Sequence, residues 1–487
     1  MFKTLVTKEL KAVFFSPKFS WMVVTCSLLM LLSVFVGIQD YRSAMDRYAA
    51  ANNLVQQEMR EARSWASLTD RVYRQPDPLQ IFAAGIDNDI GRFTSISAWE
   101  PIKLVHSAYN DDPIFAVFRY VDFAFIVEVV LTLLAILFTY DAITGERERG
   151  TLQLTLSNAV PRARYIAAKF VGSWLGLTIP ATLAVILGLL LLFVYNIPMA
   201  ADHWVRFIVL LGISLLLLTF FVAFGIFVSS VTRRSSVSFL ICLVSWVAFV
   251  LIIPRAGVMI SGQIVQVPSA AEVQNQYDMY SKDRWNQEMK RMTDTWQERM
   301  KGMAGLTDEQ RQAKQNELRP QWQDEDNAYR VATLKDIDAN GRKLNEEVRN
   351  KKLAQERVAF SISRLSPVSA YQLAVMNLAG TDTDLKNRYE DVLNAYRATF
   401  NDFRERKQKE SGSDGGLRIS VDSKTGIKID TGREIALDLS TVPQFVVAAL
   451  PLMNVVGRAV VDYGLLAVYS LLALAGAFLA FRRYDVR

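Results

Sequence analysis

The sequence predicts an all-α membrane protein with six transmembrane helices and a large, mainly helical extracytoplasmic domain that carries a small β hairpin. Three observations lead to this fold class. The 487 residues are 51% apolar and yet 21% charged, which fits neither a fully membrane-embedded chain nor an ordinary soluble one. The apolar residues gather in six long runs. Long polar segments with helical periodicity separate the first run from the second and the fifth from the sixth.

Each of the six apolar runs approaches the roughly 20 helical residues that cross about 30 Å of hydrocarbon. The first run is longer than the apolar region of a signal peptide, and no small-x-small cleavage site follows it, so we expect a retained anchor. The chain is therefore predicted to be a multi-pass membrane protein. The expected spans are residues 19–38 (within an N-terminal segment, 1–38), 114–139, 170–195, 205–228, 237–254 and 459–481 (within a C-terminal segment, 459–487).

Basic residues beside the spans predict which side of the membrane each connection faces. Lys and Arg cluster before the first span, between the second and third, between the fourth and fifth, and after the sixth. The short connection 196–204 has neither. By the positive-inside rule, both termini and the loop 140–169 are expected in the cytoplasm. Residues 39–113 and 255–441 are then expected on the other side.

The larger of these outer segments, 255–441, is expected to contain an antiparallel helical hairpin. Over residues 270–303, apolar side chains recur at mostly three- to five-residue steps, which makes one stripe on a charged helix. Thr307 and Gln310 form a capping-box pattern for a second helix, which runs to about residue 364 with an interruption at Pro320. We interpret the stripe as a packing face, with a substrate-binding surface as the alternative. The stripe consists of Tyr277, Tyr280, Trp285, Met289, Met292 and Trp296.

Shorter elements are expected around this hairpin. A helix is predicted to leave the membrane after the first span and to reach about residue 69. Residues 384–409 have the composition of another helix, and residues 418–430 alternate around a Ser-Lys-Thr-Gly turn, which predicts a β hairpin. Residues 442–458 are apolar but interrupted by prolines, so short interfacial helices are expected there before the last span.

Composition argues against several classes of function. Both cysteines, Cys26 and Cys242, lie in predicted spans, so a disulfide-stapled outer domain is excluded. The two histidines, His106 and His203, have no metal-binding spacing, so no metal site is predicted. The net charge of +6 comes largely from residues beside the spans, which fits a lipid membrane rather than nucleic acid as the partner.

The loop between the second and third spans carries the most specific pattern in the sequence. An acidic residue is followed by Glu-Arg-Glu-x-Gly-Thr-Leu, then by a Pro-Arg pair, then by a lysine just before the third span. In residue order and in topological position this loop resembles that of the ABC-2 type exporter permeases. The matching residues are Asp141, Glu146, Arg147, Glu148, Gly150, Thr151, Leu152, Pro161, Arg162 and Lys169.

This resemblance implies a coupling helix in the loop that docks on a cytoplasmic ABC ATPase, present in two copies. It also implies a second permease copy or a related permease, and a location in the bacterial inner membrane. Residues 74–87 and 366–382 look like signatures of a subgroup with an enlarged extracytoplasmic domain. The plain alternative for the loop is a solvated turn that obeys the positive-inside rule.

No catalytic site is recognisable in the sequence. The phosphate-binding pattern G-x-x-x-x-G-K-[ST] does not occur, so ATP and Mg²⁺ are expected on the partner ATPase and no cofactor in this chain. Glu128, near the middle of the second span, is a candidate for the translocation path or the dimer seam, because ionisable groups at that depth usually face protein or water. An interhelical hydrogen bond of its protonated form is the alternative.

Three functions remain open from the sequence. The first is a permease that couples the ATPase to export of a substrate. The second is an ATP-driven mechanotransmitter, whose outer hairpin acts on periplasmic partners without transport. The third is a membrane-anchored enzyme, which only the size of the outer domain supports.

Overall fold

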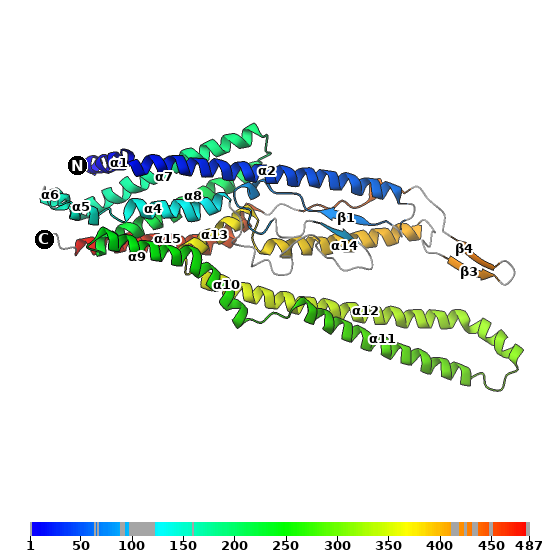
Figure 1. The fold of residues 1–487 in the computed structure, drawn as a ribbon. Coiled ribbons are helices and arrows are strands. Elements are labelled where there is room, and N and C mark those ends of the chain that lie inside the picture. The colour runs from blue at the N-terminus through cyan, green and yellow to red at the C-terminus, as the bar shows by residue number, and fades with distance from the viewer. Residues whose placement is uncertain are drawn as a thin grey trace. The chain divides into compact units, whose positions relative to one another are not determined.

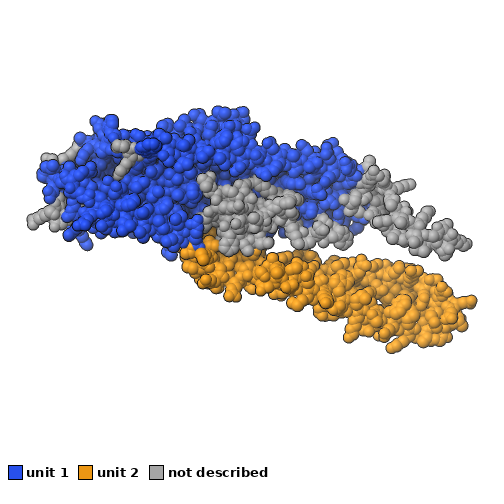
Figure 2. All heavy atoms as spheres, in the orientation of Figure 1, with its two compact units in different colours: residues 1–255, 363–487 blue, residues 256–362 orange. Residues whose placement is uncertain are grey.

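The computed structural model describes residues 2–62, 65, 68–87, 93–96, 122–157, 160–410, 418–422, 426–430, 437–447 and 451–483. Its described residues form two compact units (Figure 2). Unit 1 consists of Met1–Arg255 and Ser363–Arg487, and unit 2 of Ala256–Ile362. The architecture of each unit is given by itself.

Unit 1 contains a bundle of helices, several of them long and apolar (Figure 1). An amphipathic helix at the N-terminus precedes the first span, and a helix near the C-terminus forms the sixth span. Its helices are α1 (Phe2–Phe14), α2 (Pro17–Glu61), α3 (Phe123–Phe125), α4 (Thr132–Thr139), α5 (Thr144–Glu148), α6 (Thr151–Ser157), α7 (Arg162–Val194), α8 (Ala201–Val231), α9 (Ser235–Val247), α13 (Pro367–Ala379), α14 (Asp384–Glu410) and α15 (Leu452–Arg482).

Six helices among the described residues are long and apolar enough to cross a membrane, which confirms the predicted number. The all-α membrane class is confirmed as well. The spans run beyond the apolar runs, because polar helical turns continue into the flanking segments. They cover Phe19–Glu61, Phe123–Glu148, Arg162–Val194, Ala201–Val231, Ser235–Ile264 and Leu452–Arg482.

Two spans contain a stretch of π-helix. In the second span, η3 (Ile126–Leu131) lies between α3 and α4. In the fifth, η4 (Ala248–Ile252) separates α9 from α10 (Ile253–Ile264). The expected end of the fifth span at residue 254 is wrong, since the helix continues through Pro254. The proline ring would clash with the carbonyl four residues back, and that residue lies within the widened π turn.

Other expected boundaries also differ from the structure. The second span begins at Phe123, because Asp122 is extended and its carboxylate caps the helix; residues 114–121 lie outside the described residues. The first helix ends at Glu61 instead of residue 69, because Ala62 is extended. Residues 442–447 carry no helix, and residues 452–458 are the first turns of α15, so the predicted interfacial helices are wrong there. Pro451 is the N-cap of that continuous helix.

Small sheets and one buried helix complete unit 1. β1 (Asp70–Tyr73) pairs antiparallel with β2 (Phe93–Ile96), a sheet that the sequence did not predict. β3 (Arg418–Asp422) pairs with β4 (Gly426–Asp430) with Asp422 opposite Gly426, which confirms the predicted hairpin. Short 3₁₀ helices are η1 (Pro78–Ile81) and η5 (Leu439–Thr441). Helix α13 is buried along nearly its whole length and packs against α8, η4 and α15.

Unit 2 contains the predicted helical hairpin. Its helices are α11 (Ala270–Lys301) and α12 (Asp308–Ser363), of which only the last residue lies in unit 1. The capping box is present, because the Gln310 amide donates to Thr307 Oγ1 at 3.4 Å and the Thr307 amide to Gln310 Oε1 at 3.3 Å. The expected interruption at Pro320 is wrong, because α12 continues through it. A long helix tolerates the loss of one backbone hydrogen bond at a solvent-exposed position such as Pro320.

The apolar stripe on α11 is only in part a packing face. Tyr280 donates a hydrogen bond to Asp336 on α12 at 2.9 Å, and a side chain at Gly341 would meet the ring of Tyr277. Farther along the helix, Met289 and Trp296 remain more than half exposed, at 57% and 53%. The stripe therefore packs near the start of α11 and stays open toward its end.

Candidate functional site

The loop between the second and third spans forms two short helices, α5 and α6. At the start of α5, the Gly145 amide donates a hydrogen bond to the Asp141 carbonyl at 2.9 Å. It ends at Gly150, whose φ of 72° lies in the left-handed region that favours glycine. α6 then starts at Thr151. Gly150 therefore makes the sharp turn by which one helix follows the other.

Glu146 on α5 lies at the centre of a buried ion cluster. Its Oε2 accepts a hydrogen bond from the Tyr165 hydroxyl at 2.6 Å, and its Oε1 accepts one from Lys169 Nζ at 2.8 Å. Lys169 Nζ also donates to Glu9 Oε2 at 2.9 Å. Glu146 and Lys169 are only 6% and 5% exposed. Removing one partner of such a buried pair leaves an uncompensated charge, which costs about 3–5 kcal/mol.

The cluster brings the N-terminal helix into the site. Glu9 lies on α1 and Lys169 on α7, and these helices pack closely where Gly172 faces Glu9. A Cβ atom at Gly172 would lie 2.5 Å from the Glu9 Cβ, so only glycine permits this approach. Lys8 adds a weaker ion pair to Glu146 at 3.4 Å. α1, α5 and α7 are thus held together by charge and by close packing.

Glu148 fixes the opposite side of α5 to the fifth span. Its Oε1 accepts a hydrogen bond from the Ser235 amide at 2.7 Å, and its Oε2 accepts one from the Ser235 hydroxyl at 2.9 Å. Ser235 is the first residue of α9, whose N-cap residue makes no side-chain capping bond. A carboxylate at this place satisfies a free amide and interacts favourably with the helix dipole.

Hydroxyl groups attach α5 to the fourth span. The Oγ of Ser229 accepts hydrogen bonds from the amides of Ile143 and Thr144 at 3.0 and 3.2 Å. Thr144 Oγ1 in turn accepts one from the Ser235 hydroxyl at 3.0 Å. α5 is therefore bonded to α1, α7, α8 and α9, and a displacement of α5 must strain contacts with all four helices.

α6 has one buried side and one exposed side. Leu152 is 1% exposed and belongs to the main apolar core, whereas Leu154 is 68% exposed. The Thr151 hydroxyl donates to the Glu146 carbonyl at 3.2 Å and joins α6 to α5. An exposed leucine on a short helix that a rigid base supports is suited to contact another protein.

Comparison with known proteins agrees with this geometry. A family model described as "ABC-2 family transporter protein" matches residues 4–486, nearly the whole chain. The chain belongs to the ABC-2 transporter family. It is a multi-pass permease component of an ABC transporter, a membrane subunit of a kind that pairs with an ATPase subunit. A search of curated proteins finds no match to the chain.

In this ABC-2 family member, the loop residues that the sequence singled out fall into distinct groups. Glu146 and Lys169 bond to each other, and Glu148 bonds to the fifth span. Arg162 donates to the carbonyl of Arg482 at 2.6 Å, which connects the start of α7 to the end of α15. The Asp141 side chain lies beside Gly145.

Several residues of this site were missed in the sequence. Tyr165, Glu9 and Ser229 contribute to the site from three helices, and Tyr165 also stacks on Phe481 with ring centroids 5.2 Å apart. One signal was present, because Tyr165 precedes Lys169 by four residues and so shares its helix face. Glu9 and Ser229 had no local signal, because they reach the loop only through tertiary packing.

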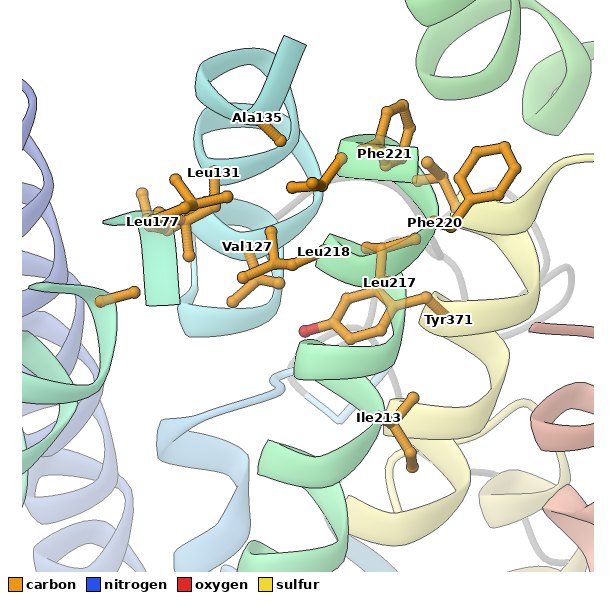
Figure 3. Close-up of a cluster of buried hydrophobic side chains, with 14 of the residues drawn as sticks. Val127, Leu131, Ala135, Leu177, Ile213, Leu217, Leu218, Phe220, Phe221 and Tyr371 are labelled. Carbon is orange, nitrogen blue, oxygen red and sulfur yellow. The ribbon is translucent and has the colours of Figure 1, made fainter. Parts of the chain in front are cut away.

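The second predicted site, at Glu128, lies in the π-helical stretch of the second span. Glu128 is 7% exposed, and its Oε2 has no hydrogen-bond partner among the described residues. One turn later, Thr132 accepts a hydrogen bond from Trp246 Nε1 at 2.9 Å. Tyr371 projects from α13 into the same apolar cluster, and its hydroxyl points to the side where Val127 lies (Figure 3). That hydroxyl is 3.2 Å from Ser214 Oγ.

The two segments marked as subgroup signatures meet in the structure. The Ile86 amide donates to the Thr381 carbonyl at 3.1 Å, and the Thr381 hydroxyl donates to the Ala83 carbonyl at 3.0 Å. All four residues of η1 are buried. The Ala84 amide donates to Asp122 Oδ2 at 2.8 Å, so this segment, residues 77–87, is fixed to the first turn of the second span.

Proposed function

We propose that the chain is the membrane-spanning permease subunit of a bacterial ABC exporter in the inner membrane. Two copies, or this chain and a related permease, pair with two ATPase subunits. The loop 140–169 is the cytoplasmic coupling element. ATP and Mg²⁺ are bound by the ATPase, and the present chain converts the movement of that subunit into substrate export.

The observation that carries this proposal is the attachment of α5 to four other helices. Glu146 connects α5 to α7, and through Lys169 to α1, while Ser229 and Ser235 connect it to α8 and α9. A push on α6 therefore reaches several spans as a rigid-body movement, the kind of transition that shifts packed helices. A loosely solvated turn would lack these buried contacts, which favours the coupling element over the plain alternative.

The docking surface is tested with an exposed residue that has no part in the ion cluster. Leu154→Asp places a carboxylate on the exposed side of α6, and we expect the affinity for the ATPase subunit to fall about tenfold or more, as when an apolar anchor is lost from an interface. Ser236→Asp, also at an exposed position but on α9, is the matched control. The measurements are co-purification of the ATPase and vanadate-sensitive ATP hydrolysis in nanodiscs. Equal binding by both variants and the wild type would rule out α6 as the docking element.

A second function, mechanotransmission, is favoured by the residues that directly follow α12. Arg364 forms a bidentate ion pair with Asp462 on α15 at 2.6 and 3.1 Å, and Asp462 is fully buried. Ser363 donates a hydrogen bond to the carbonyl of Pro254, and Ser366 donates one to that of Phe249. Residues 363–366, which end α12 and directly follow it, are thus bonded to the fifth and sixth spans. Nucleotide-driven movement of the hairpin tip is the measurement that separates this function from transport.

A further inference from the structure

Glu128 is a buried ionisable group that none of the coupling contacts uses. It lies in the second span at 7% exposure, and its Oε2 accepts no hydrogen bond from the described residues. An uncompensated carboxylate at this depth is costly by several kcal/mol. Among the described residues no donor satisfies this oxygen, so a bound proton or a cationic group would stabilise it.

The backbone around Glu128 departs from α-helical geometry. Glu128 lies in η3, and a second π stretch, η4, lies in the fifth span. Trp246, two residues before η4, donates a hydrogen bond to Thr132, the residue that follows η3. The two π stretches are therefore joined at adjacent turns. π-bulges within α-helices are frequent at functional sites, and one of these two contains the Glu128 carboxyl group.

The groups that act electrostatically on Glu128 come from three elements. Asp122 at the start of α3 is already satisfied, because it accepts amide hydrogen bonds from Ala84 and Phe125 at 2.8 Å each. Arg255 on α10 is exposed and donates to the carbonyl of Leu251. Tyr371 on α13 supplies a buried hydroxyl. Of these, Glu128 alone has a carboxylate oxygen without a donor.

We propose that Glu128 is a cation-binding group inside the membrane-spanning bundle, which takes up a proton or the ammonium group of a substrate. The hydroxyl of Tyr371, on a helix that packs against η3, is a further buried oxygen in this part of the bundle, and it lies 3.2 Å from Ser214 Oγ. The neighbouring carboxylate of Asp122 disfavours an anion at this place. The ammonium alternative rests on the proposed transport function, whereas the proton alternative does not.

The proton alternative is tested on the full chain alone, in lipid nanodiscs. Infrared difference spectra recorded during a pH titration should show the carbonyl band of a buried protonated carboxyl group in the wild type, and Glu128→Gln should lose this band. Tyr371→Phe should shift the band and keep it. Asp462→Asn changes another buried carboxyl group, one that Arg364 already balances, and should leave the band in place. A wild-type spectrum identical to that of Glu128→Gln would overturn the proposal.

The ammonium alternative is tested with dodecylamine as the probe. Dodecanol, which has the same chain length and no charge, is the control. Loss of the carboxyl band on adding dodecylamine, but not dodecanol, assigns an ammonium ligand to Glu128. An unchanged band assigns a proton-only site. In the assembled complex, dodecylamine should stimulate ATP hydrolysis by the wild type and not by Glu128→Gln. Failure of the chain to bind any ATPase would contradict the transport function and leave the infrared result standing.

Discussion

Lys169 donates to carboxylates from two other helices, and the ion cluster beside the loop between the second and third spans depends on this one side chain. Its contacts to Glu146 and Glu9 are 2.8 and 2.9 Å long, and its side chain is 6% exposed. The cluster binds α5 only while each buried charge is balanced. A serine or threonine in the lysine position would leave both carboxylates without this counter-charge, because a hydroxyl carries no charge.

Lys169→Met tests this dependence. The change removes the buried cation that Glu146 and Glu9 share, so we expect the unfolding free energy to fall by about 3–5 kcal/mol. Lys8→Met is the control, because Lys8 has a 51% exposed side chain and its loss should cost less than about 1 kcal/mol. Combining Lys169→Met with Glu146→Gln should restore part of the loss. Thermal unfolding in nanodiscs measures all three, and equal losses for the two lysines would show that burial of the cluster contributes nothing.

Asp70 predicts a pH dependence outside the membrane spans. The carboxyl group lies at 7% exposure and accepts a hydrogen bond from the Tyr396 hydroxyl at 2.6 Å. Burial raises the pKa of Asp70 above its ordinary value of 3.8, although the bond from Tyr396 opposes this in part. The stabilising contribution of a group with a raised pKa is present below its ordinary value and is lost as the pH rises through the folded-state pKa.

Asp70→Asn keeps an acceptor for Tyr396 and removes the charge. Its melting temperature should exceed that of the wild type at neutral pH, and the advantage should vanish toward pH 3.8. Asp438 is a control of opposite sign, because hydrogen bonds from Ser440 lower the pKa of its carboxyl group, so Asp438→Asn should gain nothing at neutral pH. A parallel shift of the Asp70→Asn curve at every pH would contradict the titration argument.

At the scale of elements, local signals predicted what local physics determines. The helix 384–410 was predicted within one residue, and the pairing of β3 with β4 and the capping box at Thr307 were placed correctly. Each depends on residues within a few positions of one another. The π stretches, the β1–β2 sheet and the buried position of α13 were not predicted, because they arise from contacts between distant segments. The helix end predicted at Pro254 and the interruption predicted at Pro320 were wrong for the same reason, because the surrounding structure decides whether a helix tolerates a proline.

The ion pair between Arg364, directly after α12, and Asp462 is the contact by which the mechanotransmission hypothesis is tested. A spin label on Ala304→Cys, an exposed position beyond α11, reports the distance between the hairpins of two copies. If the hairpin is driven, this distance changes between the ADP and the ATP–vanadate states. The double change Arg364→Ala with Asp462→Ala removes the pair without leaving a buried carboxylate, and should at least halve that change.

Arg342→Ala is the matched control for this double variant. Arg342 forms an exposed pair with Asp338 on the same helix, so its loss removes an arginine without touching the base of the hairpin. It should leave the nucleotide-dependent distance change intact. A wild-type hairpin that keeps one distance in every nucleotide state would eliminate mechanotransmission and leave transport as the function.

For the whole molecule, the sequence predicted the class and the loop but not how the loop is held. The order of residues from Asp141 to Lys169 was enough to recognise the family that the full-length match shows. The reason why α5 is rigid was not accessible, because Glu9, Ser229 and Ser235 are distant in sequence from Glu146 and Glu148. Nor does the alternation of spans fix which face is cytoplasmic; only the basic residues beside them do.

That orientation yields a prediction for the complete chain. The native thiols of Cys26 and Cys242 are 1% and 0% exposed, so a cysteine introduced at an exposed position dominates labelling by an impermeant maleimide. Thr151→Cys lies in the loop between the second and third spans and Ala304→Cys beyond the fifth span, and both positions are exposed. In inside-out vesicles Thr151→Cys should label and Ala304→Cys should not, and right-side-out vesicles should give the reverse. Labelling of both from one face would contradict the count of spans between them, and a reversed pattern would place α6 where no cytoplasmic ATPase can reach it.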